Sequence, residues 1–305
     1  MQTIVQGTFE ELPQRNLIMN FSRMTAAVAA ALVMSFVATN ASAESYIRPL
    51  PQHPITVGAT TLGDIRPVVT VPLVAQTHDN ILKETSTVKA LNPDMIEVRA
   101  DFWDFIEDTD ASLKMLRDIR AQMKDVPILL TVRIKAERGH KDVSENAKFN
   151  FYRAAAKEKL ADFIDIELAY GPEKITALKN DLKGTGVSLV VAYHDLNGTP
   201  SKDEIVKLME REVQAGGDVA KIVVKPNCEE DVLTFLGGTL AFRRAHPDFP
   251  IIASGSGDKG RVTRIIGGLF GIDLTFASGV KGSNPTQMPV STMRTTNQIV
   301  YPMAK

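Results

Sequence analysis

Two kinds of segment alternate along the chain from residue 55 onward. Eight short runs rich in Val, Ile and Leu are typical of buried strands: 68–74, 95–100, 127–133, 163–168, 187–193, 219–225, 250–254 and 273–278. The intervening segments have helical periodicity and charged faces, as in 108–124, 145–161, 172–183, 201–215 and 229–245. Strands that alternate with helices predict βαβ units and a parallel sheet.

The number of these units distinguishes two parallel-sheet architectures. Eight units in one domain of about 250 residues match a closed (β/α)8 barrel, the TIM barrel. An open, doubly wound sheet is the alternative, which is disfavoured because no G-x-G-x-x-G follows the first strand. Residues 55–66 predict a short N-terminal β-hairpin that closes the floor of the barrel. The predicted fold class is therefore α/β.

The first 43 residues differ from the rest of the chain. Arg15 and Arg23 precede an apolar run at 24–38, and Ala41-Ser42-Ala43 supplies the small residues that a signal peptidase reads. The run is shorter than the roughly 20 residues that cross a bilayer as a helix. We predict a cleavable signal peptide at 1–43, a periplasmic mature protein without a stable membrane span, and one catalytic domain at 44–305. A buried N-terminal helix and a membrane anchor are the alternatives.

Composition narrows the classes of partner and site. The 305 residues include 35 Lys and Arg against 36 Asp and Glu, a net charge of -1, with 44% hydrophobic residues. This balance is ordinary for a soluble globular protein and argues against a general nucleic-acid binder, which carries a basic excess. Because Cys228 is the sole cysteine, an intrachain disulfide and a cysteine-based zinc site are excluded.

Polar residues cluster at the carboxyl ends of the predicted strands, where barrel enzymes carry their chemistry. The residues that share this placement are Glu97, Arg99, Arg133, Glu137, Asp165, Glu167, His194, Lys221, Arg264, Ser283 and Gln287. Each also has a structural reading. Glu97 and Arg99 could pair as ions, and Asp165 and Glu167 could fill a layer of the barrel. Together they predict one polar site at the barrel mouth.

A lysine inside an apolar strand indicates imine chemistry at Lys221. An amine attacks a carbonyl only when neutral, and an ordinary lysine has a pKa near 10.4. Burial and the neighbouring cations Arg99, Arg133 and Arg264 would lower the pKa of this amine. The same guanidinium groups would bind a carboxylate on the substrate.

Histidine supplies the proton transfer that imine chemistry requires. His194 ends the fifth predicted strand, and Glu137 could orient its ring and stabilise its cation. Metal-dependent hydrolysis is a rival chemistry, but His194 is the only one of the five histidines that ends a predicted strand. The sequence therefore predicts no metal site. It also contains no nucleophile elbow after a strand and no Walker A motif.

The polar motifs resemble those of the type I 3-dehydroquinate dehydratase family over about residues 55–301. The motifs, in order, are Ile96-Glu97-Val98-Arg99, Thr131-Val132-Arg133 with Glu137, Asp165-Ile166-Glu167-Leu168, Val191-Ala192-Tyr193-His194-Asp195, Lys221-Ile222-Val223-Val224 and Ser283-x-x-x-Gln287. Their order and spacing together are specific, although no single motif is.

The resemblance implies roles for these residues. It implies a (β/α)8 barrel that dehydrates 3-dehydroquinate through an imine on Lys221, with His194 as general acid and base and Glu137 as its paired carboxylate. The substrate-binding residues that it implies are Glu97, Arg99 and Arg133 near the ring hydroxyls, and Arg264, Ser283 and Gln287 at the carboxylate, the last two on a closing loop. It also implies a homodimer without cofactor or metal.

The chain departs from the family pattern at two places. Ala192 stands where a small polar residue is usual, and the loop after the seventh strand, 253–257, lacks the methionines common there. The predicted export is also unusual, and it indicates use of quinate- or shikimate-type acids as nutrients. Two alternative functions stay open: a class I aldolase acting on a sugar acid, and a non-catalytic exported carboxylate binder.

Overall fold

A computed structural model of the chain describes residues 47–302. Eight parallel strands form a closed barrel: β3 (Val68–Leu73), β4 (Met95–Arg99), β5 (Ile128–Thr131), β6 (Phe163–Glu167), β7 (Ser188–His194), β8 (Val219–Val224), β9 (Ile251–Gly255) and β10 (Leu274–Ser278). Each strand pairs with the next one in sequence, and β10 pairs with both β9 and β3. The predicted TIM barrel is confirmed, and the open sheet is excluded.

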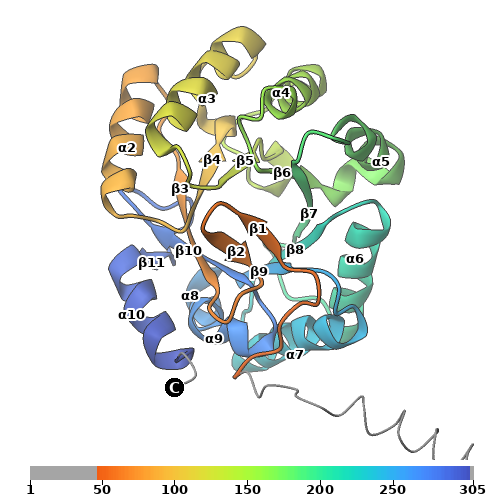
Figure 1. Ribbon diagram of the computed structural model, residues 1–305. Helices are drawn as coiled ribbons and strands as arrows, with labels where there is room; N and C mark the ends of the chain where they lie inside the picture. The colour runs from red at the N-terminus through yellow and green to blue at the C-terminus, as the bar shows by residue number, and fades with distance from the viewer. Residues whose placement is uncertain (1–46, 303–305) are drawn as a thin grey trace, which may run out of the picture. The chain divides into compact units, whose positions relative to one another are not determined.

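Helices connect the strands and surround the barrel (Figure 1). They are α2 (His78–Ala90), α3 (Thr109–Met123), α4 (Glu145–Lys157), α5 (Gly171–Asp181), α6 (Lys202–Gln214), α7 (Glu229–Ala245), α8 (Gly257–Gly260), α9 (Thr263–Ile266) and α10 (Val290–Val300). Ser144 and Ser201 begin α4 and α6 by accepting hydrogen bonds from backbone N–H groups of the first turn. After β9 the helical segment is broken into α8, α9 and the 3-10 turn η4 (Gly267–Phe270), because this stretch is rich in glycine.

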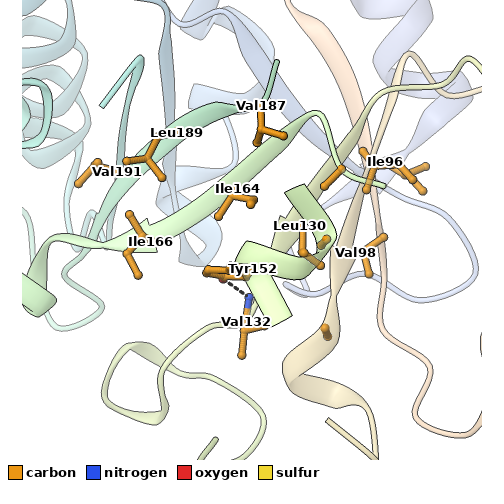
Figure 2. Packing of buried hydrophobic residues seen from close by; sticks show 14 of the residues in the cluster. Ile96, Val98, Leu130, Val132, Tyr152, Ile164, Ile166, Val187, Leu189 and Val191 are labelled. Carbon is orange, nitrogen blue, oxygen red and sulfur yellow. Dashed lines mark hydrogen bonds between the residues drawn. The ribbon is translucent and has the colours of Figure 1, made fainter. Parts of the chain in front are cut away.

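The outward face of the strands is apolar and packs beneath the helices. Figure 2 shows this layer for β4 to β7, where Ile96, Val98, Leu130, Val132, Ile164, Ile166, Leu189 and Val191 gather. Tyr152 of α4 accepts a hydrogen bond from the Val132 N–H at 2.8 Å and donates one to the Asp165 carbonyl at 2.8 Å. The phenol thus fastens α4 to two strands that carry polar residues on their inner face.

The inner face of the barrel is apolar at its amino end. The residues of this floor are Val68, Met95, Leu129, Phe163, Val190, Val219, Ile252 and Leu274. The hairpin of β1 (Ile55–Val57) and β2 (Thr60–Leu62) packs Ile55, Val57 and Leu62 against them. The hairpin lies across this end of the barrel (Figure 1), as the sequence predicts. With the floor closed by side chains, the open end is the carboxyl one.

A buried ionic contact attaches the segment before the hairpin to the barrel. Arg48 pairs with Asp273, which also pairs with Arg243 of α7. Arg48 further donates to the Gly268 carbonyl at 3.2 Å and to the Ile272 carbonyl at 3.1 Å. Both ion pairs are almost fully withdrawn from solvent, so neither cation can be lost without leaving buried polar groups unpaired.

The predicted signal peptide at 1–43 lies outside the described residues, and the domain boundary after it stays a prediction. Within residues 47–302, every helix is too short or too polar to cross a bilayer.

Arg48→Met should lower the free energy of unfolding by about 3 kcal/mol, because it breaks a buried ion pair and removes the hydrogen bonds that Arg48 donates to the carbonyls of Asp64, Gly268 and Ile272. Urea denaturation would measure the loss. Arg261→Met is the matched control, since Arg261 forms an exposed pair with Asp258 and should change the stability by less than about 0.5 kcal/mol. Equal effects of the two substitutions would contradict the importance of the buried contact.

Candidate active site

A cavity of about 170 Å³ opens at the carboxyl end of the barrel. Of the eleven residues that the sequence analysis places at the barrel mouth, Asp165 and Glu167 do not line this cavity, and nine do: Glu97, Arg99, Arg133, Glu137, His194, Lys221, Arg264, Ser283 and Gln287. They come from six strands and the loops that follow them, so only barrel closure brings them together. The cavity suits a small molecule, and its lining carries four guanidinium groups, those of Arg99, Arg133, Arg138 and Arg264.

Lys221 lies inside the barrel on β8, one layer above the apolar floor. Its side chain is 3% exposed, and its Nζ lies 2.6 Å from Asp165 Oδ2 and 3.4 Å from Glu97 Oε1. The ring of Phe276 lies 5.2 Å from the same nitrogen. The amine therefore points into the cavity and not outward beneath the helices.

The surroundings of Lys221 differ from the expectation of an amine set among guanidinium groups. The nearest charged atoms belong to two carboxylates, and Arg133 contacts the other oxygen of Asp165 at 2.6 Å. An ammonium group at this place lies against two carboxylates, and it has to release a proton before it can attack a carbonyl group. Burial would raise the pKa of Asp165, but Arg133 and Lys221 hold it well below its usual range.

His194 stands above Lys221 on the neighbouring strand. It lies beside Val223 in the β7–β8 register, two residues beyond Lys221 and on the same inner face. Its Nδ1 lies 2.6 Å from Glu137 Oε2. Burial, and then the cations Arg133 and Lys221, hold the pKa of His194 well below its ordinary value, so the ring is neutral.

The titration of Glu137 controls which ring nitrogen of His194 carries the proton. Burial raises the pKa of Glu137 to about 8, against the opposing effect of Arg133. While the carboxyl group keeps its proton, it donates to Nδ1 and the ring N–H is at Nε2. Once Glu137 is ionised, Nδ1–H donates to the carboxylate and Nε2 is free to act as a base.

Arg133 lies between the two carboxylates of β6, Asp165 and Glu167, and the Glu137–His194 pair. Its guanidinium lies 3.0 Å from Glu167 Oε1 and 3.7 Å from Glu137 Oε2, in addition to its contact with Asp165. Glu167 also pairs with Lys148 of α4, which the sequence analysis missed. One pattern could have revealed Lys148: it falls on the buried stripe of α4 with Phe151, Tyr152 and Ala155.

Glu97 and Arg99 share the inner face of β4 but do not form the ion pair considered from the sequence. Arg99 donates to both oxygens of Asp101 at 2.9 and 2.8 Å, and Glu97 accepts from Thr131 Oγ1 at 3.1 Å. Asp101, which the sequence analysis missed, also accepts from the His140 N–H at 2.9 Å. Asp101 thus holds the guanidinium of Arg99 at the rim of the cavity.

Arg264 of α9 is a buried cation with unused donors. Its Nε and Nη1 have no hydrogen-bond partner among residues 47–302, and burial lowers its pKa to about 10. On the facing loop, 279–287, Gln287 donates to Ser283 Oγ at 3.0 Å, while its buried Oε1 has no partner among the same residues. A buried guanidinium that lines a cavity and has no carboxylate partner of its own is suited to bind a carboxylate.

Arg138 is a further cavity residue that sequence reasoning missed. It is a left-handed residue with φ 62°, and its exposed side chain donates to the Leu196 carbonyl at 3.3 Å. This contact joins the loop after β5 to the loop after β7.

On the opposite wall, Ser254 of β9 lines the cavity at the place where the sequence departs from the family pattern.

Among residues 47–302, no three His, Cys, Asp or Glu side chains gather in a way that could hold a metal ion. The functional groups that line the cavity are an amine, an imidazole–carboxyl pair, the Glu97 carboxylate and guanidinium groups. They can form an imine, transfer a proton and bind an anion.

Comparison with known proteins agrees with this chemistry. The sequence model of the family described as "Type I 3-dehydroquinase" matches residues 69–303. A protein of Alkaliphilus oremlandii named 3-dehydroquinate dehydratase is 34% identical over 241 residues, 79% of this chain and 94% of that protein. The Bacillus subtilis protein of the same name is 32% identical over 247 residues, 81% of this chain and 97% of that protein.

Solved structures give the same assignment. The crystal structure of 3-dehydroquinate dehydratase from Geobacillus kaustophilus is similar with a TM-score of 0.80 and 32% identity, covering 84% of this chain and 99% of that one. A crystal structure of the type I enzyme from Clostridium difficile, with covalently modified comenic acid, has a TM-score of 0.79 and 30% identity, covering 83% and 99%. From the motifs, the barrel and these relatives together, we conclude that the chain belongs to the type I 3-dehydroquinase family.

Proposed function

We propose that this protein is a 3-dehydroquinate dehydratase, a hydro-lyase of class EC 4.2.1.10 that forms 3-dehydroshikimate through an imine on Lys221. The observation that carries the proposal is the buried Lys221 amine in one cavity with the His194–Glu137 pair. The names of the relatives support the substrate, and the covalently modified acid in the Clostridium difficile structure supports covalent chemistry.

Binding of the substrate begins with its carboxylate. The buried guanidinium of Arg264 lines the cavity without a side-chain partner among the described residues, and a carboxylate on the substrate would supply one. Ser283 and Gln287 approach from the facing loop and close this end of the cavity. Arg99, Arg133 and Glu97 bind the ring hydroxyls, so the ring is oriented before any bond is made.

Imine formation uses the carboxylates around Lys221. The amine transfers a proton to His194 and attacks the C3 ketone to form a carbinolamine. His194 then returns that proton to the carbinolamine oxygen, which leaves as water, so that an iminium ion and a neutral His194 result. Asp165 and Glu97, which stabilise the ammonium before the reaction, then stabilise the positive charge of the iminium at the same place. The positive charge of the iminium therefore forms at a place where two carboxylates already lie.

Elimination follows from the position of His194 above the imine. The iminium withdraws electrons from the adjacent C2–H bond, and Nε2 of His194 removes that proton to give an enamine. Glu137 stabilises the imidazolium through Nδ1. The imidazolium then protonates the C1 hydroxyl, water leaves, and hydrolysis of the imine releases the product and Lys221. One group acting on one face of the ring accounts for syn elimination.

Two other functions use parts of the same site. A class I aldolase also needs a buried lysine and an anion site, but every relative named above is a dehydratase. A non-catalytic binder would not need the His194–Glu137 pair beside the amine. An ultraviolet assay separates the three, because dehydration produces a conjugated enone, aldol cleavage does not, and a binder forms no product.

We infer that the mature protein acts outside the cytoplasm as a homodimer. The basic, apolar and small-residue sections of 1–43 support export, and this segment lies before the family match, which begins at residue 69. An exported dehydratase fits the use of quinate-type acids as nutrients. Light scattering of the purified protein would measure its oligomeric state.

Borohydride reduction in the presence of 3-dehydroquinate should attach the substrate to the Lys221 peptide, which peptide mass spectrometry would identify. His194→Ala should lower turnover at least about a hundredfold, because it removes the acid–base group, yet it should still be trapped by borohydride. Lys221→Met is the control and should give no adduct. Turnover by the native protein with an unlabelled Lys221 peptide would rule out imine catalysis.

The value of kcat/KM should rise with pH and level off above about pH 8, because loss of the Glu137 proton frees Nε2 of His194 to act as a base. In Glu137→Gln this limb near pH 8 should disappear, since the group that titrates there is removed and burial, Arg133 and Lys221 hold the pKa of His194 well below its ordinary value. The plateau should also fall about tenfold or more. A limb near pH 8 that persists in the Gln variant would assign the titration to another group.

Cell fractionation should find the protein in the periplasm, and its amino-terminal residue should be Glu44 if cleavage follows Ala43. Deletion of 2–43 should leave an active enzyme in the cytoplasm, because the cavity residues all follow that segment. A cytoplasmic protein that retains residues 1–43 would contradict the proposed export without affecting the proposed reaction.

A further inference from the structure

We propose that Lys148 is a positioning residue, which acts through Glu167 to fix the turn that holds Glu137 against His194. The inference rests on the proposed roles of Glu137 and His194. Lys148 itself lies behind the barrel wall on α4 and does not line the cavity.

Lys148 is a cation buried where an apolar side chain would be ordinary. Its side chain is 1% exposed, and Nζ pairs with Glu167 Oε2. The ring of Tyr170 lies 4.7 Å and that of Tyr152 5.6 Å from the same nitrogen. Burial lowers the pKa of Lys148, while Glu167 opposes that effect. A charge placed here costs free energy, so its contact with Glu167 calls for a specific role.

Glu167, the partner of Lys148, also contacts the loop after β5. Its Oε1 accepts a hydrogen bond from the Ile134 N–H at 2.9 Å and lies 3.0 Å from Arg133 Nη1. Without Lys148, the negatively charged Glu167 would be left with Arg133 as its cationic partner. We therefore expect the guanidinium to move toward Glu167, away from Asp165 and Glu137.

Ile134 is the anchor of the turn that carries Glu137. Its carbonyl accepts hydrogen bonds from the Glu137 N–H at 3.0 Å and the Gly139 N–H at 2.8 Å. Gly139 packs so closely on the Arg133 backbone that a Cβ atom there would overlap the carbonyl group. The turn is thus tight, and it is held from beneath by the bond between Ile134 and Glu167.

The Lys148–Glu167 pair also affects the pKa of Glu137. The groups that face Lys148 are Glu167, Arg133, Asp165 and the phenols of Tyr152 and Tyr170. Glu167 raises the pKa of Glu137, and Lys148 lowers it. Loss of Lys148 should therefore loosen the turn and make Glu137 harder to ionise, and both effects oppose the base form of His194.

The test compares three full-length variants by the pH profile of kcat/KM, with KM and the melting temperature measured alongside. Lys148→Met should lower kcat about tenfold through misplacement of Glu137 and move the rising limb to higher pH. KM should change by less than about twofold, because the carboxylate site at Arg264 is untouched. Lys157→Met is the matched control, since Lys157 is exposed on the same helix, and it should behave as the native protein.

The double variant Lys148→Met/Glu167→Gln provides the rescue. A glutamine oxygen can still accept from the Ile134 N–H, and no unpaired charge remains beside Arg133. Its kcat should return to within about threefold of native, with the limb near its original pH. If Lys148→Met does not fold, Lys148→Gln is measured in its place, because its neutral amide also leaves the charge of Glu167 without Lys148 and should move the limb in the same direction.

A purely structural role makes a different set of predictions. Lys148→Met would then lower the melting temperature with kcat and the pH profile unchanged, and that result would overturn the inference. A folded double variant that keeps the tenfold loss and the displaced limb would overturn it as well. Failure of the native protein to dehydrate 3-dehydroquinate would instead refute the proposed function.

Discussion

Asp165 holds two cations inside the barrel, Lys221 on one oxygen and Arg133 on the other, both at 2.6 Å. The arrangement of the site depends on this contact. All three side chains are almost fully buried, so none of the charges can be screened by water. Because each carboxylate oxygen has a cationic partner, the amine and the guanidinium have fixed places relative to each other before any ligand arrives.

The barrel separates this ionic layer from water and from the core. Side chains of successive inward residues differ by two positions, so Met95, Glu97 and Arg99 of β4 occupy the floor, the middle and the mouth in turn. The floor is apolar and covered by the hairpin. The helices cover the outward face, where Ile96 and Val98 pack (Figure 2). Polar side chains can therefore gather at one end without weakening the core.

In the proposed reaction, the ammonium and later the iminium of Lys221 lie beside the carboxylates of Asp165 and Glu97. Neighbouring guanidinium groups were the sequence-based explanation for an activated amine, but Asp165 and Glu97 lie closer to Nζ. In the proposed mechanism the amine loses its proton to His194, whose ring is neutral because burial lowers its pKa. The carboxylates serve the ammonium and the iminium alike, which is the preorganisation that reduces the reorganisation cost of a charged intermediate.

The amino-acid pattern alone determined the barrel, because apolar strands and amphipathic helices alternate with regular spacing, and it marked Lys221 and His194 as polar residues within apolar runs. It could not determine which charges meet. Lys148 of α4 reaches Glu167 of β6, and Arg138 contacts Leu196 between two loops, through the packing of different elements. Arg99 pairs with Asp101 only two residues away and not with Glu97 on its own strand. The alternation of residues along a strand fixes the face on which each side chain lies. The partner of that side chain depends on the register of the neighbouring strands and on the helix behind them, and only the closed barrel decides these.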